Sequence, residues 1–487
     1  MACRAGQIVR MTIAGVMGGA CVPAHADLTD PLILNQLQPL ERIAAVVNQS
    51  VYDQLIASQT CSDQVRSATS QCTGTVFLVF ENVRELVHTS NELAGSGPRQ
   101  FSLGLDIENL GFALRWTAAE ELAAQGASAT QFSNSQVGSL ANRLSALRFG
   151  AGGFSASARS LAPGAGLAGT SMRALGGGAG ADGESIASRW SGFIDGSFGY
   201  GSRDDTTFGQ GYEDAFDFDG QEVTIGVDYR LNDQVVLGVL GGYTDKAIDF
   251  DSSLSIVDAR IDSDGYGLMA YAQWDKGDWY INGSVGAQWL GHDLDRRITY
   301  PSFNPLVAPI DETARSDTDS SALTATFGLG YALRHNAFTL EPYIKAEYQD
   351  IDIDSFTETG ASGFDFTYGD QTVKSFETGV GLKLQYVLSA AFGVIVPYLR
   401  GEYRRELEDD ARSISAEYAG VVGLTSAAVS TSFNLPTDRP DDAYYTATGG
   451  FSVVLRHGVQ GFVQYAQVFD LDPFTDHVIT GGVRLEF

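Results

Sequence analysis

The chain has 487 residues, of which 44% are hydrophobic, so it is long enough for two or three domains. Its formal net charge is −29, from 60 acidic and 31 basic residues. Nucleic-acid phosphates require a basic surface, so this charge argues against a nucleic-acid partner. Residues 27–186 hold 14 acidic and 9 basic residues, which leaves most of the negative charge to residues 187–487.

Residues 1–26 have the layout of a secretory signal peptide. Arg4 and Arg10 form its charged region, residues 11–20 form a short apolar core, and a small-residue site ends at Ala26. Signal cleavage is therefore predicted between Ala26 and Asp27. The chain has no run of about 18 apolar residues, so no transmembrane helix is expected.

Four cysteines occur, and two of them, Cys3 and Cys21, lie in the predicted signal peptide. Cys21 could be the lipidated residue of a lipoprotein, but residues 18–20 before it lack the usual leucine. The mature chain keeps only Cys61 and Cys72. In an oxidising periplasm this isolated pair predicts a disulfide, which stabilises by roughly 3 kcal/mol. A zinc site is the competing interpretation, but no histidine or further cysteine lies near enough in sequence to complete four ligands.

Residues 27–149 are predicted to form a small α-helical N-terminal domain, whose first connection the disulfide pins. Apolar residues recur there at steps of three or four, which places them on one face of a helix. The four stripes run from Leu37 to Leu55, from Phe77 to Val87, from Leu110 to Leu122, and from Val137 to Leu147. We interpret them as core faces, and we expect His88, the only histidine in this region, at a surface or a helix end.

Residues 150–186 are rich in glycine, alanine and serine and lack hydrophobic periodicity. Such a composition is typical of a flexible linker. It joins the helical domain to the first strand of the next region.

Residues 187–487 repeat one pattern of alternating strands of about ten residues. Only a closed barrel lets β structure span a bilayer, because every backbone polar group must be paired inside lipid. Tight turns are predicted near residues 232, 276, 335, 390 and 457. Long polar connections are predicted at residues 201–220, 246–262, 292–317, 350–370, 405–443 and 469–476. The fold class is therefore a transmembrane antiparallel β-barrel of 12 strands, preceded by the disulfide-pinned helical domain and the glycine-rich linker. A soluble all-β sandwich or barrel is the alternative, but soluble sandwiches have shorter strands and their loop lengths need not alternate.

The acidic connections could in principle bind divalent cations. Asp214, Asp217 and Asp219 precede Gly220, but their spacing is wrong for a calcium loop. A solvated acidic face is the simpler interpretation, and we expect no metal and no cofactor.

The whole arrangement resembles a classical autotransporter of the type V secretion systems. Residues 187–487 carry the resemblance, most clearly at Trp190–Tyr200, Pro397–Tyr403 and Gly481–Phe487. It implies a monomeric barrel in the outer membrane of a Gram-negative bacterium, in contact with lipid and lipopolysaccharide, with a helix or extended segment in its lumen.

The resemblance also implies a C-terminal signal for the barrel-assembly machinery, reached with the help of periplasmic chaperones. On this chain the signal falls on Val483, Leu485 and Phe487. Some family members cut themselves between paired asparagines, but Asn134 and Asn142 are isolated here. The short helical domain is therefore expected to stay attached, either at the cell surface or in the periplasm.

The sequence predicts a barrel without enzymatic activity that anchors and translocates its own helical domain, for adhesion or another surface interaction. A nucleophilic serine needs a base within reach, and the chain has neither a Gly-Asp-Ser block nor a Gly-x-Ser-x-Gly motif. The barrel histidines, which are His292, His335, His457 and His477, lie in turns or near strand ends without such a motif. A porin-like pore with a periplasmic N-terminal domain and an outer-membrane hydrolase remain the alternatives.

Overall fold

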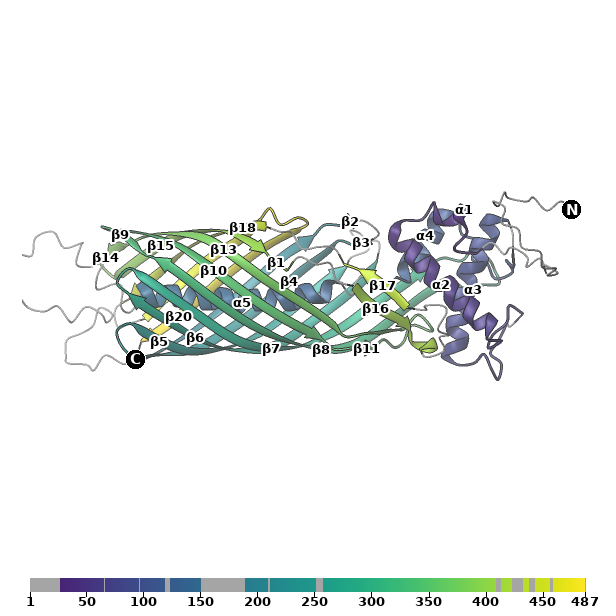
Figure 1. Ribbon diagram of the computed structural model, residues 1–487, viewed down its shortest axis with the longest axis horizontal. Coiled ribbons are helices and arrows are strands. Elements are labelled where there is room, and N and C mark those ends of the chain that lie inside the picture. Colours follow the sequence, from purple (N-terminus) through teal and green to yellow (C-terminus); the bar gives the residue numbers. More distant parts are fainter. Residues whose placement is uncertain are drawn as a thin grey trace, which may run out of the picture.

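The structure is an antiparallel β-barrel whose strands are tilted relative to its axis. The barrel encloses one long helix, and a group of helices lies at one of its ends (Figure 1). The computed structural model describes residues 27–64, 66–95, 97–118, 123–149, 189–208, 211–250, 257–408, 413–422, 432–437, 443–455 and 459–486. The predicted signal peptide, the predicted linker and Phe487 lie outside the described residues.

Twelve strands close into a ring, because the last strand pairs with the first and the remaining neighbours pair in chain order. They are β1 (Trp190–Arg203), β4 (Phe216–Arg230), β5 (Val235–Phe250), β6 (Asp258–Lys276), β7 (Trp279–Tyr300), β8 (Ile310–Tyr331), β10 (Phe338–Ile353), β13 (Gln371–Tyr386), β15 (Gly393–Glu406), β18 (Ala443–Leu455), β19 (Val459–Phe469) and β20 (Phe474–Glu486). The predicted 12-stranded antiparallel barrel is confirmed.

Shorter strands lie at the two ends of the barrel. They are β2 (Thr206–Phe208), β3 (Gly211–Glu213), β9 (Leu333–His335), β11 (Phe356–Thr357), β12 (Phe366–Tyr368), β14 (Leu388–Ala390), β16 (Ser413–Tyr418) and β17 (Ser432–Pro436). Strands β9 and β14 belong to the end with the tight turns, which we call the turn end, whereas β11, β12, β16 and β17 form a small sheet at the opposite end (Figure 1).

An outward-facing apolar band surrounds the barrel. On β4, Ile225 is 63% exposed, whereas its neighbour Thr224 is 1% exposed and faces the lumen. Trp279 and Trp289 are exposed on β7, ten residues apart, and each ring packs against a tyrosine of a neighbouring strand. At about 3.3 Å per residue and a tilt of about 40°, they bound a band about 25 Å tall, which is the height of an outer-membrane barrel's lipid-facing surface.

Beyond this band the apolar side chains move from the outer face of the strands to the inner face. Much of two segments that were predicted as long connections is strand there. Residues 245–250 of β5, 258–265 of β6, 290–300 of β7 and 310–320 of β8 continue the barrel wall, and we call them the outer extensions. Their inner faces are apolar, as at Ile261 and Ile298, while Asp262 and Asp293 face outward. The expected long connections over 246–262 and 292–317 were wrong, because the hydrophobic alternation changes phase there rather than ending. The acidic residues on the outer faces of these strands are solvated, as predicted, but Asp214, which was expected to be solvated as well, is 3% exposed.

Four helices form a cap on the outer extensions, at the end opposite the turns (Figure 1). They are α1 (Pro31–Leu34), α2 (Pro39–Ala57), α3 (Thr75–Ala94) and α4 (Ile107–Trp116), and we use the word cap for residues 27–118. Local signals set their ends, since Pro39 and a capping box of Gln38 and Glu41 begin α2, and Gly95 in the left-handed region ends α3. Among the described helices, none is long and apolar enough to cross a membrane.

The cap and the outer extensions share one hydrophobic core. Phe80 and Leu110 of the cap belong to the same buried cluster as Ile261, Ile298 and Phe366 of the barrel strands and the small sheet. The predicted helical region is therefore not a separate globule, because part of its core is provided by the barrel.

Candidate functional site

The fifth helix, α5 (Ala123–Phe149), runs through the barrel lumen from the cap toward the turn end (Figure 1). Its apolar stripe, which the sequence assigned to the helical domain, packs instead on the inner wall of the barrel. Leu140, Leu144 and Leu147 form one buried cluster with wall residues that include Leu240 and Met269. The stripe was correctly predicted to be helical and buried, but its partners lie on β1, β5 and β6.

Two arginines tie the second half of α5 to the wall. Arg143 donates to the Asp228 carboxylate of β4 from Nε at 3.2 Å and from Nη2 at 2.9 Å. Arg148 lies one and a half turns later and contacts Glu341 of β10 at 3.4 Å. All four side chains are at most 9% exposed, so each charge is compensated where water is scarce.

Polar residues along α5 make further contacts on several sides of the lumen. They are Asn134 with Gln349, Gln136 with Gln288, Ser139 with Asp195, and Ser145 with Lys383. The helix is thus held at successive turns by different strands, which fixes both its depth and its rotation.

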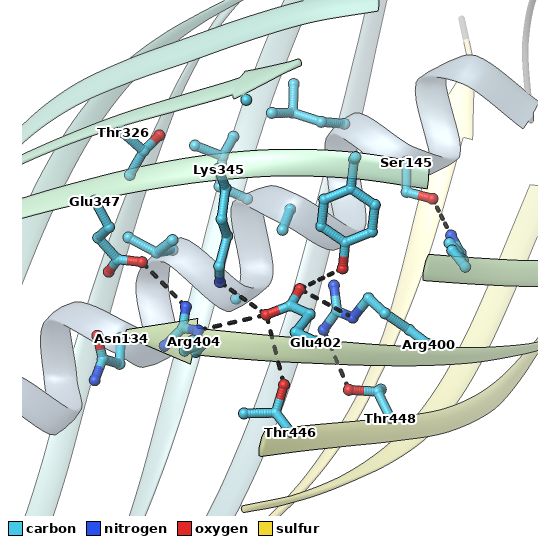
Figure 2. Close-up of a pocket in the computed structure, with 18 of the residues that line it drawn as sticks. Asn134, Ser145, Thr326, Lys345, Glu347, Arg400, Glu402, Arg404, Thr446 and Thr448 are labelled. Carbon is cyan, nitrogen blue, oxygen red and sulfur yellow. Dashed lines mark hydrogen bonds and ion pairs between the residues drawn. The ribbon is translucent and has the colours of Figure 1, made fainter. Parts of the chain in front are cut away.

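A cavity of about 210 Å³ lies between α5 and the wall from β7 round to β20. Figure 2 shows Lys345, Arg400 and Arg404 converging on Glu402. The Lys345 ammonium lies 2.9 Å from the Glu402 carboxylate, Arg404 lies 3.4 Å from it, and Arg400 lies 3.7 Å from it. Arg404 also pairs with Glu347 at 3.2 Å. This network makes one side of the lumen strongly hydrophilic, as expected for a wet barrel interior.

A second set of polar contacts joins the cap to the outer extensions. Arg296 of β7 donates to the Trp116 carbonyl at 3.3 Å and pairs with Glu358 through two hydrogen bonds. The Tyr418 hydroxyl donates to the Asn48 amide oxygen at 2.7 Å. Arg115 of α4 lies 3.6 Å from Asp214, and both side chains are buried. These contacts, together with the shared apolar core, attach the cap firmly to the barrel.

The loop at the tip of the β7–β8 hairpin adds backbone pairing to this attachment. The Phe303 amide donates to the Leu103 carbonyl at 2.7 Å, and the Asn304 side-chain amide donates to the Ser102 carbonyl at 2.7 Å. Gly104 has φ +70°, a backbone conformation that a side chain would strain, and it lies against Phe303.

The predicted disulfide between Cys61 and Cys72 is confirmed. His88 is not at a surface or a helix end, as expected, but lies inside α3 and is 1% exposed. Its Nδ1 accepts the Phe101 amide proton at 3.1 Å, and its Nε2 lies 3.5 Å from Asp63. Burial alone would raise the pKa of Asp63, but hydrogen bonds from His88 and Tyr52 hold it below its usual value. His88 is therefore a packed core residue, because its ring contacts Tyr52 and Phe101 on a side of α3 where the apolar stripe did not predict burial.

The other predicted site residues are scattered over the structure. Asp27 is the first described residue of the cap, and Ala26 lies outside the described residues, so the cleavage site stays a prediction. Val483 faces outward with 44% exposure, Leu485 is paired in β20, and Phe487 lies outside the described residues, so the C-terminal signal also stays a prediction.

The candidate calcium residues do not converge. Asp217 and Asp219 point outward from β4, whereas Asp214 turns inward to Arg115, and no group of three or more potential ligands occurs among the described residues. The isolated Asn134 and Asn142 both lie on α5, inside the lumen.

Residues 193–466 match the family model of the autotransporter β-domain, which is more than half of the chain. The chain belongs to the autotransporter family. The autotransporter β-domain places this barrel in the outer membrane of a Gram-negative bacterium, where barrels of the family are assembled by the BAM-type machinery.

Two curated relatives show how this autotransporter differs in length from others. It is 24% identical to Esterase EstA of Pseudomonas aeruginosa over 271 residues, which are 54% of this chain but 38% of the esterase. It is 25% identical to the Probable autotransporter YfaL of Escherichia coli over 234 residues, which are 45% of this chain and 18% of that protein. The chain thus spans less than two fifths of the length of these relatives.

Among solved structures, the barrel is similar to the translocator domain of the autotransporter NalP from Neisseria meningitidis. The TM-score is 0.46 at 16% identity, covering 61% of this chain and 88% of that one. The β-domain of the Bordetella autotransporter BrkA aligns with a TM-score of 0.39 at 14% identity, covering 61% and 99%.

Proposed function

We propose that this autotransporter exports its own cap through the barrel and keeps it docked on the outer extensions at the cell surface. The observation that carries the proposal is α5, which passes through the lumen and so joins the cap at one end of the barrel to the turn end at the other. Short turns of outer-membrane barrels face the periplasm, so the cap end faces outward. The exposed apolar band suits lipid and lipopolysaccharide contact, and a closed ring leaves no edge for a second copy, which supports a monomer.

We further propose that the cap is not an enzyme but a surface module for adhesion or another contact. Its single histidine supports this, because both ring nitrogens of His88 face protein groups and the ring is 1% exposed. A general base must reach a substrate proton, and this imidazole is closed off from solvent. The match to the esterase covers 38% of its length, so it does not by itself assign that activity to this chain.

Surface labelling of single cysteines tests the export proposal. Leu32 in the cap is 65% exposed, and Asp233 lies exposed in the first tight turn. With Cys61 and Cys72 held in their disulfide, L32C should react with a membrane-impermeant maleimide on intact cells, whereas D233C should react only after the outer membrane is permeabilised. Protection of L32C on intact cells, with D233C behaving as described, would place the cap in the periplasm and refute the proposal.

The cavity beside α5 favours a second candidate function, conduction of small ions past the helix. Its lining includes five cationic and four anionic side chains from α5, β10, β13, β15 and β20. Conductance in planar bilayers tests this candidate, with R404M as the variant that should change the ion selectivity. The absence of any conductance at all voltages tested would exclude this function.

A further inference from the structure

The seam between β1 and β20 is where the barrel closes, and glycines interrupt its cross-strand side-chain pairs. Thirteen residue pairs join the two strands, and five of them contain a glycine. Examples are Gly196 opposite Gly481 and Asp195 opposite Gly482. Cross-strand side-chain pairs supply much of the stability of a sheet, and a glycine contributes none. The seam therefore depends more on groups outside the two strands than a pair of β-branched strands would.

Helix α5 contacts both sides of this seam from within the lumen. On the β1 side, Ser139 donates to the Asp195 carboxylate at 2.8 Å, and Arg143 Nη2 donates to the Ser191 hydroxyl at 2.7 Å. On the β20 side, Arg484 donates to the Asn142 carbonyl at 3.4 Å. Residues 139, 142 and 143 lie on adjacent turns of one helix face, so one short stretch of α5 reaches across the closure.

The same stretch of α5 also contacts β4, the strand that pairs with β1 on the side away from the seam. Arg143 bonds to Asp228 of β4, and Ser191 of β1 donates to the same carboxylate at 2.9 Å. Each of the two arginines also makes a cation–π contact with an aromatic ring. The Arg143 guanidinium lies 5.2 Å from the Phe193 ring centre, and the Arg484 guanidinium lies 4.2 Å from the Phe462 ring centre. Four strands, β4, β1, β20 and β19, are thereby linked through one buried cluster.

We propose that α5 acts as an internal staple that holds the first and last strands of the barrel together, in addition to filling the lumen. This goes beyond the proposed export function and does not depend on which side of the membrane the cap occupies. The ion pair of Arg148 with Glu341 serves as the built-in comparison, because it joins α5 to β10, on the far side of the ring from the seam.

The test combines loss of the staple with a covalent lock on the seam. The variant R143M/D228N removes the ion pair without leaving one charge unpaired, and R148M/E341Q is its matched control. The seam lock is the disulfide of the variant G196C/G481C. Gly196 and Gly481 are opposite each other and face lipid, and a Cβ added at either position makes only ordinary van der Waals contacts. The control lock is G241C/L268C, which joins β5 to β6 at an equivalent outward pair.

The readout is the temperature at which the purified full-length barrel in detergent loses its heat-modifiable gel migration, measured without reductant. In the G241C/L268C background, R143M/D228N should lower this midpoint by about 5 °C or more. In the G196C/G481C background, the same double variant should lower it by less than half as much, because the seam is already closed. R148M/E341Q should give the same shift in both backgrounds.

Equal shifts of R143M/D228N in the two locked backgrounds would overturn the proposal, and so would the absence of any shift. If R143M/D228N fails to assemble, S139A removes one seam contact with less disturbance and is judged by the same comparison.

Discussion

At the scale of single residues, the buried carboxyl of Glu85 shows how the cap depends on its environment. Glu85 lies on α3 with 6% exposure, and the nearby charged groups are Glu81 and Arg84 on its own helix. From the barrel side Tyr300 of β7 faces it closely enough for the two groups to interact electrostatically. Burial, followed by the charge of Glu81, raises the pKa of Glu85 to about 8.

This raised pKa predicts that the cap loosens as the pH rises. Folding raises the pKa above its ordinary value of 4.5, so the folded state binds a proton that the unfolded state has lost. The contribution of Glu85 to stability is then greatest below about pH 4.5, falls up to about pH 8, and is lower on the order of a few kcal/mol above that. In limited proteolysis of the full-length protein, the cap should be cut faster at pH 9 than at pH 6.

The variant E85Q should remove most of this difference, because glutamine stays neutral at both pH values. E92Q is the matched control, since Glu92 is exposed on the same helix and should behave as the unmodified chain does. An unchanged pH difference in E85Q would show that another group controls it.

At the scale of elements, the outward face of the long strands contacts lipid over one part of their length and water over the other. On β7, Val285 faces lipid with 53% exposure, whereas beyond Trp289 the outward positions carry Asp293 and Asp295. The inner positions change in the opposite sense, from Gln288 to Ile298. The strand can therefore continue into water because its apolar face turns inward, toward the cap.

The inversion predicts that inner positions of the extensions matter for cap docking while outer positions do not. I298A removes a fully buried side chain from the shared core and should cost about 2–4 kcal/mol in docking stability. T299A, the next residue on the opposite face, should cost close to nothing. Protease sensitivity of the cap measures the effect, and heat-modifiable migration should be unchanged in both variants. Equal sensitivity of the two variants would contradict the inversion.

At the scale of the whole molecule, the protein is one barrel with two zones of stability. The membrane zone is held by a closed hydrogen-bonded ring, whereas the cap zone is held by side-chain packing, the disulfide and buried polar contacts. Backbone pairing in lipid is costly to break, since freed polar groups find no water there. The two zones should therefore fail separately.

Loss of the disulfide tests this separation. C61S/C72S should weaken the cap by roughly 3 kcal/mol, because the link closes a short loop between α2 and α3. The cap should then become sensitive to protease, while the barrel keeps its heat-modifiable migration. Loss of that migration together with the cap would mean that the molecule folds as one unit.

Periodicity determined much of this structure in advance. Alternation of apolar and polar residues with period two predicted all twelve strands, because lipid on one side and a wet lumen on the other impose that pattern. The pair Cys61 and Cys72 predicted the disulfide, and spacing by three or four predicted buried helix faces. The seam residues, such as Arg143 and Asp228, gave no such signal, because an isolated arginine on a helix can equally face solvent.

The sequence by itself determined the barrel, its strand number, its turns and the helical character of the N-terminal region, since each of these follows from neighbours a few residues apart. Only the tertiary structure decided that the stripe from Val137 to Leu147 faces the barrel wall and that the cap completes its core with strand residues. An apolar stripe states that a face must be buried but not against what. The partner is chosen by contacts between residues more than a hundred positions apart, such as Arg148 with Glu341, and local patterning does not carry that information.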